Sequence, residues 1–72
     1  MIDMPPLDDR VFSALEANPY VSQRNLRFET DEGRVILRGK VGTFFQKQMA
    51  QESLRNVDGV QEIDNELEVS WA

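Results

Sequence analysis

Residues 33–41, Gly-Arg-Val-Ile-Leu-Arg-Gly-Lys-Val, carry the pattern that most limits how this chain can fold. Apolar and basic side chains alternate along this stretch, so they fall on opposite faces of an extended segment: Val35, Leu37 and Val41 on one, and Arg34, Arg38 and Lys40 on the other. A period of two indicates a half-buried strand, and the run is too short and too β-branched to favour a helix. We therefore predict that residues 34–41 form the central strand of a small sheet.

A helix is predicted before this strand. Residues 1–6, which end in Pro5-Pro6, are expected to form a loose tail. Apolar residues then recur at helical spacing, with Asp8 as the expected N-cap. Asn18 precedes Pro19, and a residue before proline avoids the α region, so the helix is predicted over residues 8–18.

A hairpin is predicted to link this helix to the central strand. Residues 25–30 alternate apolar and charged side chains, which predicts a first strand. Asp31-Glu32-Gly33 then predicts the turn, with Gly33 at a positive φ. Gly39, on the inner face of the central strand, predicts a close backbone approach or a bulge.

A second helix and a third strand are predicted to follow. Thr43 and Gln46 have the spacing of a capping box, so the helix begins near Phe44, and Gly59 after Asp58 suits its left-handed end. Its expected inward stripe is Phe45, Met49, Ala50, Ser53, Leu54 and Val57. The last strand, residues 60–69, is expected to turn Ile63, Asn65, Leu67 and Val69 inward and Asp64, Glu66 and Glu68 outward.

The charges on the outer faces predict the neighbours of each strand. The basic face of the central strand matches the acidic face of the last strand, and opposite charges on adjacent strands are mildly favourable. The first two strands are expected to be antiparallel, and the second and third parallel through a right-handed crossover. The predicted fold is α+β, a two-layer sandwich of order α-β-β-α-β, with a three-stranded mixed sheet and both helices on one face.

Composition excludes several functions. The 72-residue chain is long enough for one domain, and it has neither cysteine nor histidine, which removes thiolate zinc sites, Ser-His triads and the commonest general base. The net charge of −5 argues against bulk attraction to nucleic acid or to an anionic membrane. No stretch approaches the roughly 20 apolar residues of a membrane span, and the N-terminus lacks the features of a signal peptide. We expect no catalytic residues, metal or cofactor.

The glycine and apolar pattern resembles the BON domain, a bacterial family named after osmotically inducible and nodulation proteins. The similarity rests on Gly33-x-Val35-x-Leu37-x-Gly39-x-Val41, on Val57-x-Gly59-Val60, and on Ile63-x-Asn65-x-Leu67-x-Val69, and it covers residues 7–70 as one domain. The resemblance implies a non-enzymatic binding module, often for phospholipid membranes, in periplasmic or envelope proteins. Without a signal peptide, the protein is expected in the cytoplasm if these residues are its full length.

Six residues are candidates for ligand binding: Lys40, Gly42, Thr43, Phe44, Arg34 and Arg38. A helix N-terminus near Gly42 and Thr43 could receive a phosphate, and Phe44 could enter a lipid interface. Alternatively Thr43 only caps the helix and Phe44 covers the sheet edge, which we favour. The basic stripe could meet lipid head groups or an acidic partner, or could pair with the acids of the last strand, which we also favour. Gly33, Gly39, Gly59 and Asn65 are expected to be structural.

The remaining signals leave the partner open. Gly39 and Gly42 have the Gly-x-x-Gly spacing of nucleic-acid-binding KH loops, but here a strand precedes the motif, so we expect no nucleic acid. Trp71 is either packed on the sheet edge or an interface anchor. We expect a phospholipid surface or another protein domain as the partner, with the chain a monomer or a weak oligomer. A protein-interaction module in a larger assembly is the alternative function.

Overall fold

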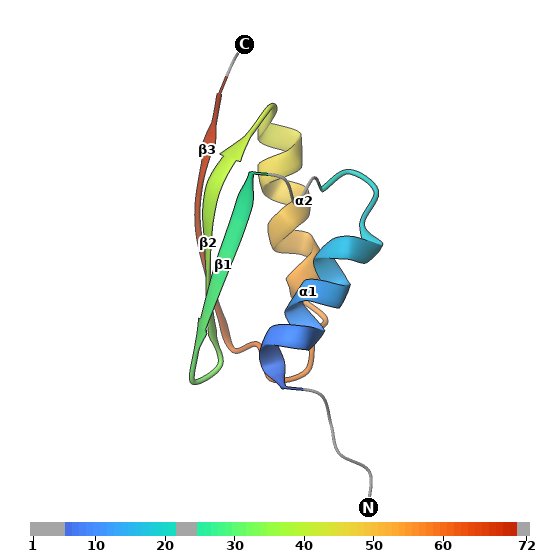
Figure 1. Ribbon diagram of the computed structural model, residues 1–72, viewed down its shortest axis with the longest axis vertical. Coiled ribbons are helices and arrows are strands. Elements are labelled where there is room, and N and C mark those ends of the chain that lie inside the picture. Colours follow the sequence, from blue (N-terminus) through green and yellow to red (C-terminus); the bar gives the residue numbers. More distant parts are fainter. Residues whose placement is uncertain (1–5, 22–24, 71–72) are drawn as a thin grey trace, which may run out of the picture.

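The chain folds into two helices packed on one face of a three-stranded mixed sheet (Figure 1). The computed structural model describes residues 6–21 and 25–70. Its elements, in chain order, are α1 (Leu7–Ala17), β1 (Leu26–Asp31), β2 (Arg34–Val41), α2 (Phe44–Leu54) and β3 (Glu62–Val69). The predicted α+β fold and its α-β-β-α-β order are confirmed. Most of the expected tail at residues 1–6, and Trp71, lie outside the described residues.

β2 is the central strand, with the bounds that its alternating pattern predicts. It pairs antiparallel with β1 and parallel with β3, as expected. Asp31 pairs with Arg34, so the hairpin turns through two residues only, Glu32 and Gly33. Their φ angles are 49° and 89°, and a two-residue hairpin turn of type I′ requires positive values at both positions.

The core lies between the sheet and the two helices. Its buried members come from every element: Val11, Leu15, Leu26, Val35, Leu37, Val41, Ala50, Leu54 and Leu67. Val35 and Leu37, on the inner face of β2, are fully buried. Ile63 and Val69 of β3 pack against this core from its margin, so the predicted inward face of the last strand is confirmed.

The first helix begins differently from its prediction. Pro6 is the N-cap, and its carbonyl accepts hydrogen bonds from the backbone N–H groups of Asp9 (3.0 Å) and Arg10 (3.2 Å). Asp8 therefore lies inside the helix rather than at the cap, and its carboxylate accepts a hydrogen bond from the Thr30 hydroxyl of β1. The prediction of Asp8 as N-cap is wrong because Pro6, whose φ is already near the helical value, takes the cap position. The helix therefore begins at Leu7, one residue before the predicted start.

The second helix ends earlier than predicted. Beyond Leu54 the chain continues in three-residue steps, with N–H to carbonyl bonds from Arg55 to Glu52, Val57 to Leu54 and Val60 to Val57. These tighter turns replace the last helical turn. β3 then begins at Glu62, two residues after the expected start, because the N–H groups of Gln61 and Glu62 both donate to the Gly33 carbonyl before the ladder begins.

Candidate ligand-binding surface at one end of the sheet

The outer face of the sheet carries ion pairs between neighbouring strands. The Arg34 guanidinium lies 2.7 Å from the Asp64 carboxylate, and Arg38 lies 3.7 Å from Glu66 and 3.4 Å from Glu29. The hydrogen bond that Arg34 donates to Asp64, followed by the negative charge of that carboxylate, raises the pKa of Arg34 above its ordinary value. The favoured interpretation, that these arginines pair with acids of the last strand, is confirmed for Arg34 and Arg38.

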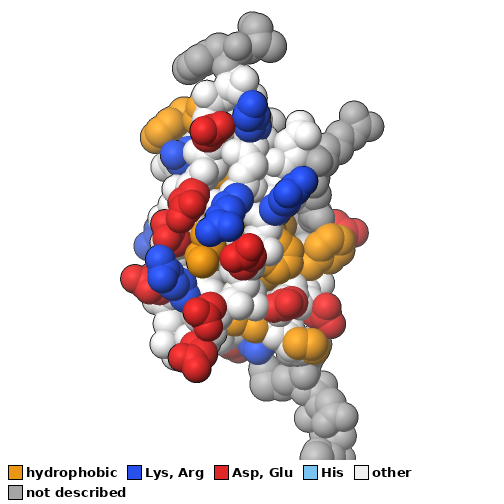
Figure 2. All heavy atoms as spheres, turned by 60° about the vertical axis from the view of Figure 1, so that its left-hand side comes forward, with side chains coloured by type: hydrophobic (Ala, Val, Ile, Leu, Met, Phe, Trp, Pro, Cys, Tyr) orange, Lys and Arg blue, Asp and Glu red, His pale blue; other side chains and the backbone are white. Residues whose placement is uncertain are grey.

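Lys40 differs from the two arginines of the predicted stripe. Its register partner on β3 is Glu68, yet no ion pair joins Lys40 to any residue in the described ranges. Figure 2 shows basic side chains gathered toward the upper half of the outer face, and acidic side chains predominate below them. The unpaired end of the stripe is therefore the end at which β2 runs into α2.

The start of α2 is closed by its own cap. The Thr43 hydroxyl accepts a hydrogen bond from the Gln46 backbone N–H (3.1 Å), and the Gln46 side-chain oxygen accepts one from the Gly42 N–H (2.8 Å). The predicted capping pair is confirmed, although Gln46 reaches Gly42, one residue before the position that a capping box uses. The side chains of Thr43 and Gln46 thus occupy two backbone N–H groups at the start of the helix, those of Gln46 and Gly42. Thr43 therefore serves as the N-cap, as the favoured interpretation expected.

Phe44 and Lys40 meet beside this cap. They line a shallow hollow of about 570 Å³ together with Lys47 of α2, Glu68 and the end of β3. The Phe44 side chain is 65% exposed. The structure thus brings together two of the predicted site residues, Lys40 and Phe44, and adds Lys47, which the sequence did not single out. Arg34 lies at the opposite end of β2 and takes no part.

Two further exposed aromatic side chains lie at this end of the molecule. Phe45 is 51% exposed and Tyr20 is 54% exposed, and their rings pack edge to face with centroids 5.1 Å apart. The expectation that Phe45 faces the core is wrong, because Ala50 and Leu54 fill the space beneath α2 and Phe45 packs on Tyr20 instead. We call Tyr20, Phe44 and Phe45 the aromatic ridge.

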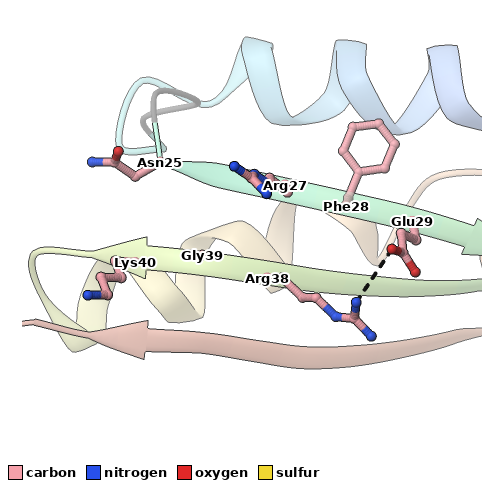
Figure 3. Close-up of a pocket in the computed structure, with 7 residues that line it drawn as sticks. All are labelled: Asn25, Arg27, Phe28, Glu29, Arg38, Gly39 and Lys40. Carbon is pink, nitrogen blue, oxygen red and sulfur yellow. Dashed lines mark hydrogen bonds and ion pairs between the residues drawn. The ribbon is translucent and has the colours of Figure 1, made fainter.

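A second hollow, of about 470 Å³, opens between β1 and β2 (Figure 3). Its lining is Asn25, Arg27, Phe28, Glu29, Arg38, Gly39 and Lys40. Phe28 points toward α1, whereas the charged side chains belong to the outer face. Lys40 lines this hollow and the one beside Phe44, so the two are neighbours.

Gly39 shapes the rim of this hollow. Its φ is 128°, and a Cβ built there would lie 1.9 Å from the Asn25 carbonyl oxygen. That carbonyl accepts a hydrogen bond from the Lys40 N–H at 3.0 Å. The absent side chain therefore lets Asn25 approach β2 closely and places it beside Lys40.

Asn65 connects α2 to the sheet beneath the ridge. Its side-chain NH₂ donates to the Lys47 carbonyl (2.9 Å) and to the Gln51 side-chain oxygen (3.2 Å), and its oxygen accepts from the Leu67 N–H (3.2 Å). Each polar atom of this half-buried amide has a partner, which holds the first turns of α2 on β3.

Within residues 6–21 and 25–70, no group of three or more Asp and Glu side chains is arranged to hold a metal ion. No helix in the described part of the chain is long and apolar enough to cross a membrane. A family model described as the BON domain matches residues 5–70. No curated protein sequence matches the chain.

Proposed function

This chain belongs to the BON domain family, and from that membership we propose that it is a binding module which contacts an anionic phospholipid surface through the aromatic ridge, Lys40 and Lys47. The family is a non-catalytic one, associated with bacterial envelope proteins. A role for this chain at the envelope is part of the proposal. The observation that carries it is the exposed Phe44 beside Lys40 and Lys47, next to the exposed pair of Phe45 and Tyr20.

The aromatic ridge has a composition suited to the membrane interface. Aromatic side chains are favoured where one side of the ring is apolar and the other is wet. Phe44 and Phe45 each leave more than half of their residue surface in water, and neither belongs to the buried core. A lipid interface would remove that apolar surface from water, which supports the ridge as a contact site rather than as packing.

The two lysines give the contact its charge. Lys40 and Lys47 line the hollow beside Phe44, and neither forms an ion pair within the described residues. A basic side chain near an anionic membrane contributes about 1 kcal/mol. Two lysines and the ridge together support weak, salt-sensitive binding. Glu68 in the same hollow opposes it, so the aromatic contribution is needed as well.

Vesicle co-sedimentation tests the proposal. The protein is mixed with phosphatidylglycerol-containing vesicles or with neutral phosphatidylcholine vesicles, and the bound fraction is measured against salt. We expect binding to the anionic vesicles that falls with salt, and Phe44→Ala and Lys47→Gln should each weaken it. Amide signals of residues 42–47 should shift selectively on binding.

Phe12→Ala provides the matched control. Phe12 is an exposed phenylalanine of α1 (47% exposed) that lies outside the aromatic ridge. Its replacement should therefore leave vesicle binding unchanged. If Phe12→Ala weakens binding as much as Phe44→Ala, the contact lies elsewhere. If neither vesicle binds at high lipid concentration, the lipid proposal fails, and a protein partner becomes the better explanation of the ridge.

A further inference from the structure

Arg27 and Arg38 face each other directly across the β1–β2 ladder, on the outer face of the sheet. Like charges directly opposite on adjacent strands destabilise a sheet, so Arg27 gains no stabilisation from its cross-strand partner. Both residues line the hollow between the strands, and Lys40 is the next outward-facing residue of β2. Three cationic side chains therefore line one hollow of a chain whose net charge is −5, with Lys40 at one end of it and the Arg38 guanidinium turned toward Glu29 (Figure 3).

The acids near this hollow neutralise only part of that charge. Arg38 contacts Glu29 at 3.4 Å and Glu66 at 3.7 Å, both longer than a close charge-assisted hydrogen bond. Arg27 and Lys40 form no ion pair with any residue of the described ranges. Figure 3 shows that only Glu29 among the lining residues brings a negative charge. Two positive charges thus remain without a partner.

From this geometry we propose that the hollow binds a phosphate monoester dianion, held by Arg27, Arg38 and Lys40. Arg27 and Lys40 have no ion-pair partner among the described residues, and arginine binds phosphate oxygens through paired N–H groups. Asn25 lies at the rim, where its backbone carbonyl is held beside Lys40 by the close approach at Gly39. The volume of about 470 Å³ accommodates a phosphate with a small group attached.

The ligand can come from two sources, a soluble phosphate monoester or the headgroup of a phosphomonoester lipid. The shared chemistry is the terminal phosphate. A lipid source would extend the function proposed above, because Lys40 lines both hollows and would place the headgroup beside the aromatic ridge. A soluble source would make the hollow a separate ligand site. The site itself is independent of the aromatic ridge.

Amide NMR of the full chain, titrated with glycerol 3-phosphate, tests the site. We expect saturable millimolar binding with shifts centred on Arg27, Arg38 and Lys40, and a loss of roughly fivefold in affinity for Arg27→Gln or Lys40→Gln. Arg34→Gln is the matched control, because Arg34 lies on the same face of β2 but already pairs with Asp64. It should leave the affinity unchanged. Equal shifts with chloride at matched ionic strength, or an equal effect of Arg34→Gln, would overturn the site.

The pH of the titration gives an independent readout. The second pKa of a phosphate monoester is about 6, so affinity should fall between about pH 7.5 and pH 5.5 as the dianion is protonated. The chain has no histidine, and the charged groups of the hollow are Arg27, Arg38, Lys40 and Glu29, with Glu66 and Glu68 of β3 beside Arg38 and Lys40. Protonation of any of these carboxylates would favour an anion, so a loss of affinity on acidification reports the ligand. An affinity that rises on acidification would contradict binding of the dianion.

Vesicles distinguish the two sources. If phosphatidic acid vesicles bind more tightly than phosphatidylglycerol vesicles of matched surface charge, and Arg27→Gln removes the difference, the ligand is a lipid headgroup. If Arg27→Gln weakens glycerol 3-phosphate binding only, the ligand is soluble. Both outcomes support the site. Phe44→Ala should weaken vesicle binding and leave glycerol 3-phosphate binding intact, so the lipid function and the phosphate site can fail separately.

Discussion

Replacing Gly39 by alanine tests how closely the two strands of the hairpin must approach. The new Cβ would lie 1.9 Å from the Asn25 carbonyl oxygen and 3.0 Å from its carbonyl carbon. Both atoms belong to the backbone, so no side-chain rotation relieves the overlap. The residue also has a φ of 128°, which L-residues with a Cβ rarely adopt.

The expected loss of stability follows from these two effects. Unfavourable backbone conformations cost about 1–3 kcal/mol. Separation of the strands would weaken the Lys40 N–H to Asn25 carbonyl bond, which contributes about 0.5–1.5 kcal/mol. We therefore expect Gly39→Ala to lower the free energy of unfolding by about 2–4 kcal/mol, out of a total of about 4–11 kcal/mol for a domain of this length.

Denaturant unfolding followed by circular dichroism measures this loss, and Gly42→Ala is the matched control. Gly42 lies just after the same strand, but its φ is not positive, and an added Cβ meets only the movable Gln46 side-chain oxygen at 3.3 Å. Its replacement should change stability by less than about 1 kcal/mol, in either direction. If Gly39→Ala costs less than about 1 kcal/mol, or no more than Gly42→Ala, the strands are not held together as described.

Two further stability predictions use the hairpin and the core. Leu37→Ala removes a fully buried side chain at the centre of the sheet, so it should cost about 2–5 kcal/mol in the same assay, and a loss below about 1 kcal/mol would place Leu37 outside the core. Glu32→Asn should stabilise the protein, because Glu32 has a φ of 49° and asparagine tolerates the left-handed region better; a fall in the unfolding midpoint would contradict the turn geometry.

The sheet could be predicted from the sequence because alternation and charge constrain it in different ways. The period of two set the bounds of β2, and the match between its basic face and the acids of β3 indicated which strands are neighbours. In the structure, the matching charges form the ion pairs Arg34–Asp64 and Arg38–Glu66. The helix ends were less predictable, because either Asp8 or Pro6 could precede the first helical turn. The choice depends on the tertiary contact in which the Asp8 carboxylate accepts a hydrogen bond from Thr30.

The candidate site was less accessible from the sequence. Phe45 has the spacing of a core residue, and its exposure depends on Tyr20, which lies 25 positions earlier (45 − 20) and meets it only after α1 packs on α2. The facing arginines did leave a signal. Once the turn is assigned to Glu32 and Gly33, counting outward from the turn places Arg27 opposite Arg38. Arg27 and Lys40 form no ion pair within the part of the chain that the structure describes, and this depends on side-chain positions, which the sequence pattern does not contain.

Distance along the sheet explains how an acidic chain can present a cationic end. A strand of eight residues spans about 26 Å, at about 3.3 Å per residue. The Debye length at physiological salt is about 8 Å, so charges at the turn end of β2 are screened at the other end. Asp31, Glu32 and Glu62 gather near the turn, whereas Arg38 and Lys40, with Glu66 and Glu68 opposite them on β3, lie toward the end that leads into α2. An approaching anion at that end therefore responds to these local charges rather than to the net charge of −5. The net charge of −5 thus opposes only long-range attraction to an anion, whereas the proposed contacts act at short range.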